Sequence, residues 1–203
     1  MEPNAKKISM GEAVQFGWDT MKGRFWFFAG MVALLFALSA VNGAAQKHGA
    51  ASAIVGLIVW LMSILVGAGI QRIALKTIDG QPTGFGDLFP FDIYWKYLGT
   101  TLLVMLVVLG GFILLIVPGI VWALKYGYAN YLVVDKGLAG RAALVRSAEI
   151  TQGAKGRIFL FGILLFLINL LGFIVIFVGC FAAIPLTFLA SAYVYRKLAA
   201  ATA

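Results

Sequence analysis

The chain has few of the residues from which catalytic and metal sites are usually built. Its 203 residues include one histidine, His48, and one cysteine, Cys180. One histidine excludes multi-histidine metal sites, and one cysteine excludes an intramolecular disulfide or a cysteine cluster. The acids beyond the first third of the chain stand singly in expected caps and turns, namely Asp79, Asp87, Asp92, Asp135 and Glu149. We therefore expect a protein that is not an enzyme and holds no cofactor or metal.

Charged residues are also scarce, and this scarcity indicates the class of protein. Only 12% of the residues are charged and 62% are hydrophobic, and the mean hydropathy is +0.97. Such a chain needs lipid as its solvent, because soluble domains are far more polar. A bilayer core of about 30 Å takes roughly 20 apolar residues in a helix. By this measure the candidate spans are 25–45, 50–75, 98–117, 120–134, 158–178 and 179–194. The sequence thus predicts an all-α polytopic membrane protein whose six transmembrane helices form three hairpins.

Proline is rare, with five residues in the chain, and two of them fall within or between the apolar stretches. If residues 98–134 formed one helix kinked at Pro118, it would extend about 55 Å, well beyond a bilayer. We expect instead a turn at Val117-Pro118-Gly119 between two shorter spans. Pro185 lies in the sixth stretch, where a proline can mark the break of a discontinuous transporter helix.

Basic residues are distributed unevenly between the two sides of this arrangement. Of the 16 Lys and Arg residues, most lie in the N-terminal segment, the second and fourth connections and the C-terminus, which share one side. Lys125 lies within the fourth stretch, and Lys47 alone lies in an outer loop. The positive-inside tendency places the basic side, with both termini, in the cytoplasm. Topology and attraction to anionic headgroups account for the net charge of +8, so no nucleic-acid partner is expected.

A weak repeat divides the single domain into three units, at 9–78, 82–135 and 138–198. Each unit has a short amphipathic stretch, then basic and aromatic residues, then a hydrophobic hairpin. The second unit has the shortest amphipathic stretch, which Pro90 interrupts. Two explanations remain open, because an internal duplication and the common needs of interface anchoring would both produce this pattern.

The amphipathic stretches have features of helices that lie at a membrane surface. In the first, a Ser-x-x-Glu capping box precedes an apolar stripe that includes Trp18. In the third, Val145 belongs to the stripe, while Arg141 and Arg146 are available for the polar face. We expect short amphipathic interfacial helices in front of the hairpins, with recognition of a partner helix as the alternative.

Lys125 is the ionisable residue that we expect at membrane depth. It follows Gly119 by six residues, or about 9 Å of helix. An ionisable side chain at that depth is costly and usually faces a cavity or a partner. We consider two interpretations: Lys125 contacts an anion or lipid phosphate, with Tyr128 and Tyr131 on the same side of the helix, or its stem extends back to the headgroups.

The second half of the chain resembles known families. The run Leu-Ile-Val-Pro-Gly-Ile at 115–120 is followed by spaced aromatic and small residues: Tyr126, Ala129, Tyr131, Ala142, Ala143, Leu144, Ser147, Thr151 and Gly153. Residues 82–200 are similar to bacterial multi-pass membrane proteins of uncharacterised function, which are related to the membrane domain of some glycerophosphodiester phosphodiesterases. No soluble segment is long enough for a phosphodiesterase domain. The resemblance implies a six-helix module of the bacterial cytoplasmic (inner) membrane, not an activity.

Two functional interpretations remain open. The first is a non-catalytic inner-membrane protein that organises lipids or partner proteins, because this role needs only the features described above. The alternative is a channel or transporter for a small or anionic solute, with Lys125 near the path. The expected partners are membrane lipids and either a second copy of the chain or another membrane protein.

Overall fold

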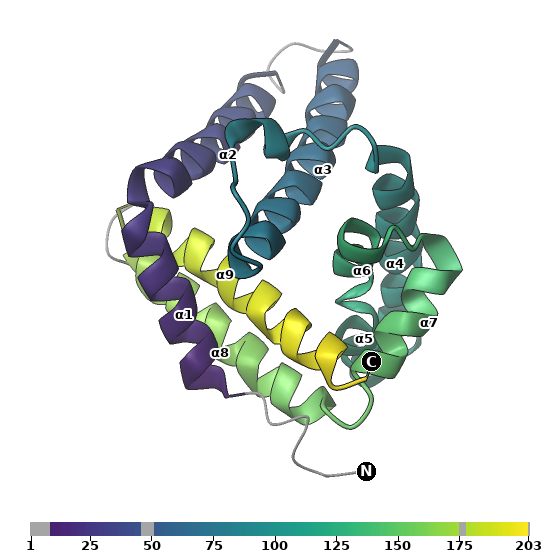
Figure 1. Cartoon of the computed structure of the whole chain (residues 1–203). Helices are drawn as coiled ribbons and strands as arrows, with labels where there is room; N and C mark the ends of the chain where they lie inside the picture. The colour runs from purple at the N-terminus through teal and green to yellow at the C-terminus, as the bar shows by residue number, and fades with distance from the viewer. Residues whose placement is uncertain (1–8, 46–50, 175–177, 203) are drawn as a thin grey trace.

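The computed structural model describes residues 9–45, 51–174 and 178–202, and every regular element in this part of the chain is helical (Figure 1). In chain order the elements are α1 (Met10–Gly23), α2 (Phe25–Ala45), α3 (Ala51–Ile78), the 3-10 helix η1 (Phe85–Leu88), α4 (Tyr94–Leu114), α5 (Ile116–Tyr126), α6 (Ala129–Lys136), α7 (Gly140–Ile150), α8 (Lys155–Ile174) and α9 (Val178–Ala200). The all-α prediction is confirmed. The predicted outer loop with Lys47 lies outside the described residues.

The long helices α2, α3, α4, α8 and α9 coincide with five of the six predicted spans. By length and composition, three helices of the described residues can cross a membrane: Ala53–Ile78, Tyr94–Leu114 and Lys155–Ile174. A fourth is added if α1 and α2, which meet at a bend of 97°, are taken as one span. The fold is therefore helical with three to four candidate membrane-spanning helices.

The turn between the third and fourth stretches lies at Leu115, not at Val117-Pro118-Gly119. Leu115 has an extended backbone, with φ −166° and ψ 157°, and separates α4 from α5. Pro118 is the third residue of α5, where an N–H would have no helical partner. Its fixed φ suits the first turn of a helix, so Pro118 lies in the first turn of α5 instead of forming the turn between the helices.

Gly119 lets two helices approach each other closely. A Cβ atom at Gly119 would lie 2.5 Å from the ring of Phe112, and one at Gly111 would lie 3.0 Å from the Cα of Gly119. The same construction recurs between α8 and α9, where a Cβ at Gly179 would collide with the carbonyl of Gly172. Close approach at small residues is a common way to pack helices in lipid.

The predicted fourth span, 120–134, is two helices instead of one. The first helix, α5, ends at Tyr126, and α6 begins at Ala129. Next to this interruption, the carbonyl of Lys125 accepts a hydrogen bond from the hydroxyl of Ser147 at 2.9 Å. The hydroxyl of Thr151 lies 3.3 Å from the same carbonyl, although its shortest bond is to the Ser147 carbonyl at 2.8 Å. Because the last carbonyls of a helix lack helical partners, these hydroxyls stabilise the end of α5.

Pro185 does not break α9, so the prediction of a break there is wrong. The helix runs from Val178 to Ala200 with Pro185 inside it. The ring removes one backbone N–H, but Pro185 is buried and α9 contacts α1, α2, α3 and α8. Packing against several helices maintains a helix that contains a proline.

Contacts between the three units follow a cyclic order. The second apolar helix of each unit contacts the first apolar helix of the next: α3 contacts α4, and α5 contacts α8. The order closes on itself, because α9 of the third unit contacts α2 of the first. The short element that begins each unit packs on the last helices of the unit before it in this order. These contacts are η1 with α3, α7 with α5 and α6, and α1 with α9. Figure 1 shows α9 running across the molecule between α1 and the α4–α7 group. This order places α3, α6 and α9 towards the centre.

The helix α1 is packed on α9 through small residues. A Cβ at Gly17 would lie 3.0 Å from the carbonyl oxygen of Leu186, and Ala13 and Met21 are buried on the same side. Trp18 is 44% exposed. The leading element of the second unit is only the four-residue 3-10 helix η1, because glycine and proline residues interrupt the segment. A position of this short helix at the membrane surface stays a prediction.

Candidate functional site

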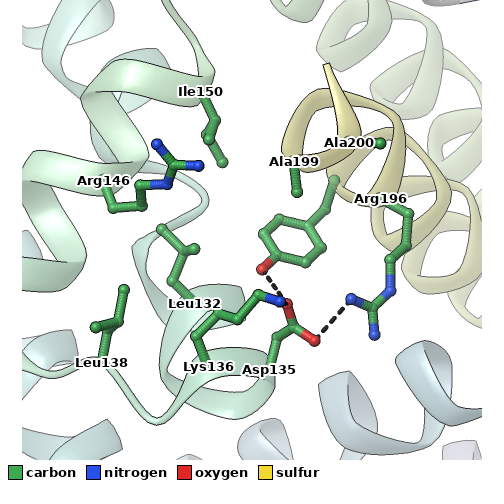
Figure 2. A pocket seen from close by; sticks show the side chains of 10 residues that line it. Leu132, Asp135, Lys136, Leu138, Arg146, Ile150, Arg196, Ala199 and Ala200 are labelled. Atoms are coloured by element: carbon green, nitrogen blue, oxygen red, sulfur yellow. Dashed lines mark hydrogen bonds and ion pairs between the residues drawn. The ribbon is translucent and has the colours of Figure 1, made fainter. Parts of the chain in front are cut away.

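The C-terminal ends of α3, α6 and α9 meet in a network of charged and phenolic groups. Arg196 of α9 donates from one Nη atom to Asp135 of α6 and from the other to Asp79, just beyond α3, each at 2.6 Å. The hydroxyl of Tyr195 donates to the second oxygen of Asp135 at 2.7 Å. Figure 2 shows both bonds to Asp135. One arginine therefore joins the ends of three helices that are far apart in sequence.

The ion pair between Asp135 and Arg196 is largely shielded from water. The side chain of Asp135 is 9% exposed and that of Arg196 is 26% exposed. Both carboxylate oxygens of Asp135 accept a hydrogen bond, which offsets the cost of removing the charge from water. Lys136 lies 3.7 Å from the same carboxylate but is 61% exposed, so water weakens this third interaction.

Three buried tyrosines adjoin the network. The ring centroids of Tyr131 and Tyr195 lie 5.3 Å apart, and those of Tyr128 and Tyr131 lie 5.9 Å apart. Aromatic rings at such distances attract each other beyond the effect of burial alone. Tyr128 and Tyr131 therefore pack the start of α6 against α9.

The structure does not bring Lys125 together with Tyr128 and Tyr131. The ammonium of Lys125 lies 5.1 Å from the ring centroid of Tyr126, at a distance that allows a cation–π interaction. The predicted grouping requires one uninterrupted helix, whereas α5 ends at Tyr126. The rings of Tyr128 and Tyr131 instead lie beside that of Tyr195 in α9. A contact between Lys125 and an anion stays a prediction.

Of the predicted interfacial residues on α7, Arg146 joins the network region and Arg141 does not. Arg146 donates to Glu149 and to the carbonyl oxygen of Thr202, each at 2.9 Å. It thereby ties α7 to the residues that follow α9. Arg141 is exposed and lines an open hollow on α7 with Val145, which is 50% exposed.

Two cavities flank the pair of Asp135 and Arg196, and both residues line each cavity. The first has a volume of about 520 Å³ and lies between α6, α7 and α9. The second has a volume of about 340 Å³ and lies between the end of α3 and the pair. The remaining lining of the first cavity consists of Leu132, Lys136, Leu138, Arg146, Ile150, Tyr195, Ala199 and Ala200.

Further ion pairs hold the segment after α3 along that helix. Arg72 pairs with Asp92 at 2.6 Å, and Lys76 pairs with Asp87 at 2.5 Å. The Arg72 hydrogen bond lowers the pKa of the Asp92 carboxyl, against the opposing effect of burial. Burial raises the pKa of Asp87, but hydrogen bonds from Lys76 and from the Gly84 N–H outweigh it, so this pKa is also lowered.

Sequence reasoning missed the central pair of the network. By sequence, Asp135 and Arg196 are charges that follow apolar stretches, and neither belongs to a local motif. A usable signal exists: each stands at the end of a long apolar stretch, where opposite charges at the same membrane side can pair. The sequence does not indicate which acids Arg196 meets.

The site has no feature that identifies a reaction or a relative. Among the residues that the structure describes, no three His, Cys, Asp or Glu side chains form a group that could hold a metal ion. Comparisons of the chain with protein-family models, with curated proteins and with solved structures found no match.

Proposed function

We propose that the chain is a non-catalytic integral protein of the bacterial inner membrane that organises lipids or partner proteins. It would have six spans in three hairpins and both termini in the cytoplasm. The observation that carries the proposal is the outward apolar surface of the long helices. In the most apolar windows of α4 and α8, only 17% of the residues are buried. Surface of this kind needs lipid or an apolar partner to cover it.

In this proposal α5 and α6 together form the fourth span. The two helices have 11 and 8 residues, and with the two residues between them they would cover about 30 Å. The amide of Asn130 in α6 donates to the hydroxyl of Thr101 in α4 at 3.1 Å. This bond supports a return path alongside α4, because α5 also packs against that helix.

Exposed aromatic residues support a membrane interface beside the basic segments. Trp26, Phe91 and Trp95 are 85%, 71% and 77% exposed. Each lies near a basic residue at the start of a long helix or in the connection before it. Trp in particular is enriched where bilayer headgroups meet the apolar core, because its ring has both a polar and an apolar part.

Transport has less support than an organising role. Lys125 lies against Tyr126 and is not part of the lining of the two cavities at the network. Flux of small neutral and anionic tracers through liposomes, with Lys125→Leu as the matched control, tests this alternative. Flux that depends on Lys125 would support a channel or transporter; its absence from a folded, oriented protein supports the organising role.

Reporter fusions test the topology. Fusions after Thr77, after Gly137 and at the C-terminus should report the cytoplasm, whereas a fusion after Lys47 should report the outside. The fusion after Gly137 is the most informative, because it depends on α5 and α6 crossing together. An outside signal there would contradict the six-span arrangement.

The organising role is tested by extracting the protein with its surrounding lipids in polymer-bounded native discs. We expect the disc lipids to differ from the bulk membrane, or a membrane protein to be present in fixed ratio. Discs of an unrelated polytopic protein from the same cells are the control. Bulk lipid composition without a partner would contradict the proposal.

A further inference from the structure

Three cations and one acid line the cavity between α6, α7 and α9. Lys136, Arg146 and Arg196 supply positive charge and Asp135 supplies negative charge. The lining itself therefore has two more cations than acids, while Glu149 and Asp79, which pair with Arg146 and Arg196, lie outside it. The cations come from three helices and surround one space. Such an arrangement favours an anion, because several donors reach it from different directions.

Lys136 and Arg146 retain hydrogen-bond donors that an anion could use. The ammonium of Lys136 lies 3.7 Å from Asp135, beyond hydrogen-bond distance, and its side chain is 61% exposed. The guanidinium of Arg146 has five N–H donors, and the bonds to Glu149 and the Thr202 carbonyl use one on each Nη atom. Figure 2 shows Arg146 extending from α7 into the space beside α9. Arg196 is different, because both its Nη atoms bind carboxylates.

The rest of the cavity wall is apolar. Leu132, Leu138 and Ile150 form it together with alanines of α9 and with Tyr195, whose hydroxyl is bonded to Asp135. Free phosphate would leave this surface in contact with water, whereas the glycerol and first methylene groups of a lipid would cover it. The volume of about 520 Å³ suits a small ligand or a headgroup with the start of its chains.

The position of the cavity agrees with such a ligand. It lies at the ends of α6 and α9 beside α7, which the proposed orientation places at the cytoplasmic headgroup level. Lipid phosphates are abundant at that level, and anionic lipids attract basic segments there.

We propose that this cavity binds the phosphate-bearing headgroup of an anionic lipid. Lys136 and Arg146 contact the phosphate, Arg196 and Asp135 hold the helices that form the walls, and the leucines cover the start of the acyl chains. This inference rests on the proposed function and deepens it, because it names the class of lipid and its site.

The test uses the full chain in a neutral detergent, with short-chain dihexanoyl phosphatidylglycerol as the probe. Calorimetric titration should give saturable binding. Phosphatidylcholine with the same chains and inorganic phosphate should bind at least about tenfold more weakly, because one lacks net charge and the other lacks the apolar part. Equal binding of phosphatidylcholine, or of inorganic phosphate, would overturn the lipid assignment.

Substitutions locate the site. The double variant Lys136→Gln/Arg146→Gln should weaken phosphatidylglycerol binding about tenfold or more. Lys96→Gln/Arg141→Gln is the matched control, because it also removes two positive charges from exposed positions outside the cavity. An equal loss in the control would show general charge attraction and contradict the site. The single variant Lys136→Gln alters a mainly exposed side chain, so it should fold. If neither this variant nor the double variant weakened phosphatidylglycerol binding, the proposed site would also be contradicted.

Native discs separate this inference from the proposed function. If discs of the wild type and the double variant are equally enriched in one lipid class, the cavity assignment fails and the organising role stands. If wild-type discs match the bulk membrane and hold no partner protein in fixed ratio, the organising role fails, whatever the detergent titration shows. Loss of anionic-lipid enrichment in the double variant alone supports both.

Discussion

Asp135 and Arg196 are 61 residues apart in the sequence and form a 2.6 Å ion pair in which the carboxylate is 9% exposed. The pair joins α6 to α9, and the second Nη atom of Arg196 extends the connection to Asp79 after α3. The three helix ends therefore depend on one guanidinium.

Removing Asp135 should destabilise the protein strongly. Asp135→Ala leaves the Arg196 guanidinium and the Tyr195 hydroxyl without their main acceptor, so we expect a loss of about 3 kcal/mol in the free energy of unfolding. Asp79 is 34% exposed, and Asp79→Ala should cost less than about 1 kcal/mol. Unfolding in mixed detergent micelles measures both. Equal losses in the two variants would contradict the central role of Asp135.

Any side chain at Gly119 should destabilise the contact between α4 and α5. Gly119→Ala forces the helices apart at Phe112 and should cost about 1–3 kcal/mol. Gly110→Ala is the matched control, because nothing lies within 4 Å of a Cβ there and alanine favours helix. Thermal unfolding should show a lower midpoint for Gly119→Ala only. A lower midpoint for Gly110→Ala would show that the effect is not specific to the contact.

The side chain of Lys125 should matter less to stability than the hydroxyl that binds its carbonyl. Lys125→Leu removes a contact with Tyr126 and should change the unfolding free energy by less than about 0.5 kcal/mol. Ser147→Ala removes a buried hydrogen bond to the Lys125 carbonyl and should cost about 1 kcal/mol. If Lys125→Leu proved the more destabilising, the side chain would have a partner beyond Tyr126.

Acid should weaken the attachment of the segment after α3. The pKa values of Asp87 and Asp92 are lowered in the fold, so the unfolded carboxyls bind protons at higher pH. The ion pairs therefore stabilise the fold above the ordinary aspartate pKa of about 3.9, and this contribution is lost as pH falls through the lower folded values. The double variant Asp87→Asn/Asp92→Asn should lose less stability between pH 6 and pH 3 than the wild type. Identical acid profiles would contradict this assignment.

Cysteine labelling should show whether α1 and α7 lie at a membrane surface. Trp18 and Val145 are about half exposed in the fold, so the protein itself does not cover them. Trp18→Cys and Val145→Cys should nevertheless resist water-soluble thiol reagents in native membranes, because lipid headgroups and chains would cover them. Gln81→Cys, in an exposed connection, is the labelled control. Full labelling at Trp18 and Val145 would contradict the interfacial position.

The sequence was most informative where the structure depends on local composition. The long helices α2, α3, α4, α8 and α9 coincide with apolar stretches, because a run of some 20 apolar residues without charges has few stable conformations besides a helix in lipid. It was less informative at prolines. Pro118 lies in the first turn of a helix and Pro185 lies inside one, because the effect of proline depends on whether the helix needs the missing N–H at that position.

By itself, the sequence determined the helical class and the approximate extent of five long helices. Only the tertiary structure decided that the chain turns at Leu115, that Lys125 meets Tyr126 instead of Tyr128, and that Arg196 binds Asp135 and Asp79. The physical reason is range. Hydrophobic length and charge are properties of neighbouring residues, whereas a break in a helix or an ion pair across 61 residues is stabilised by contacts that no local pattern specifies.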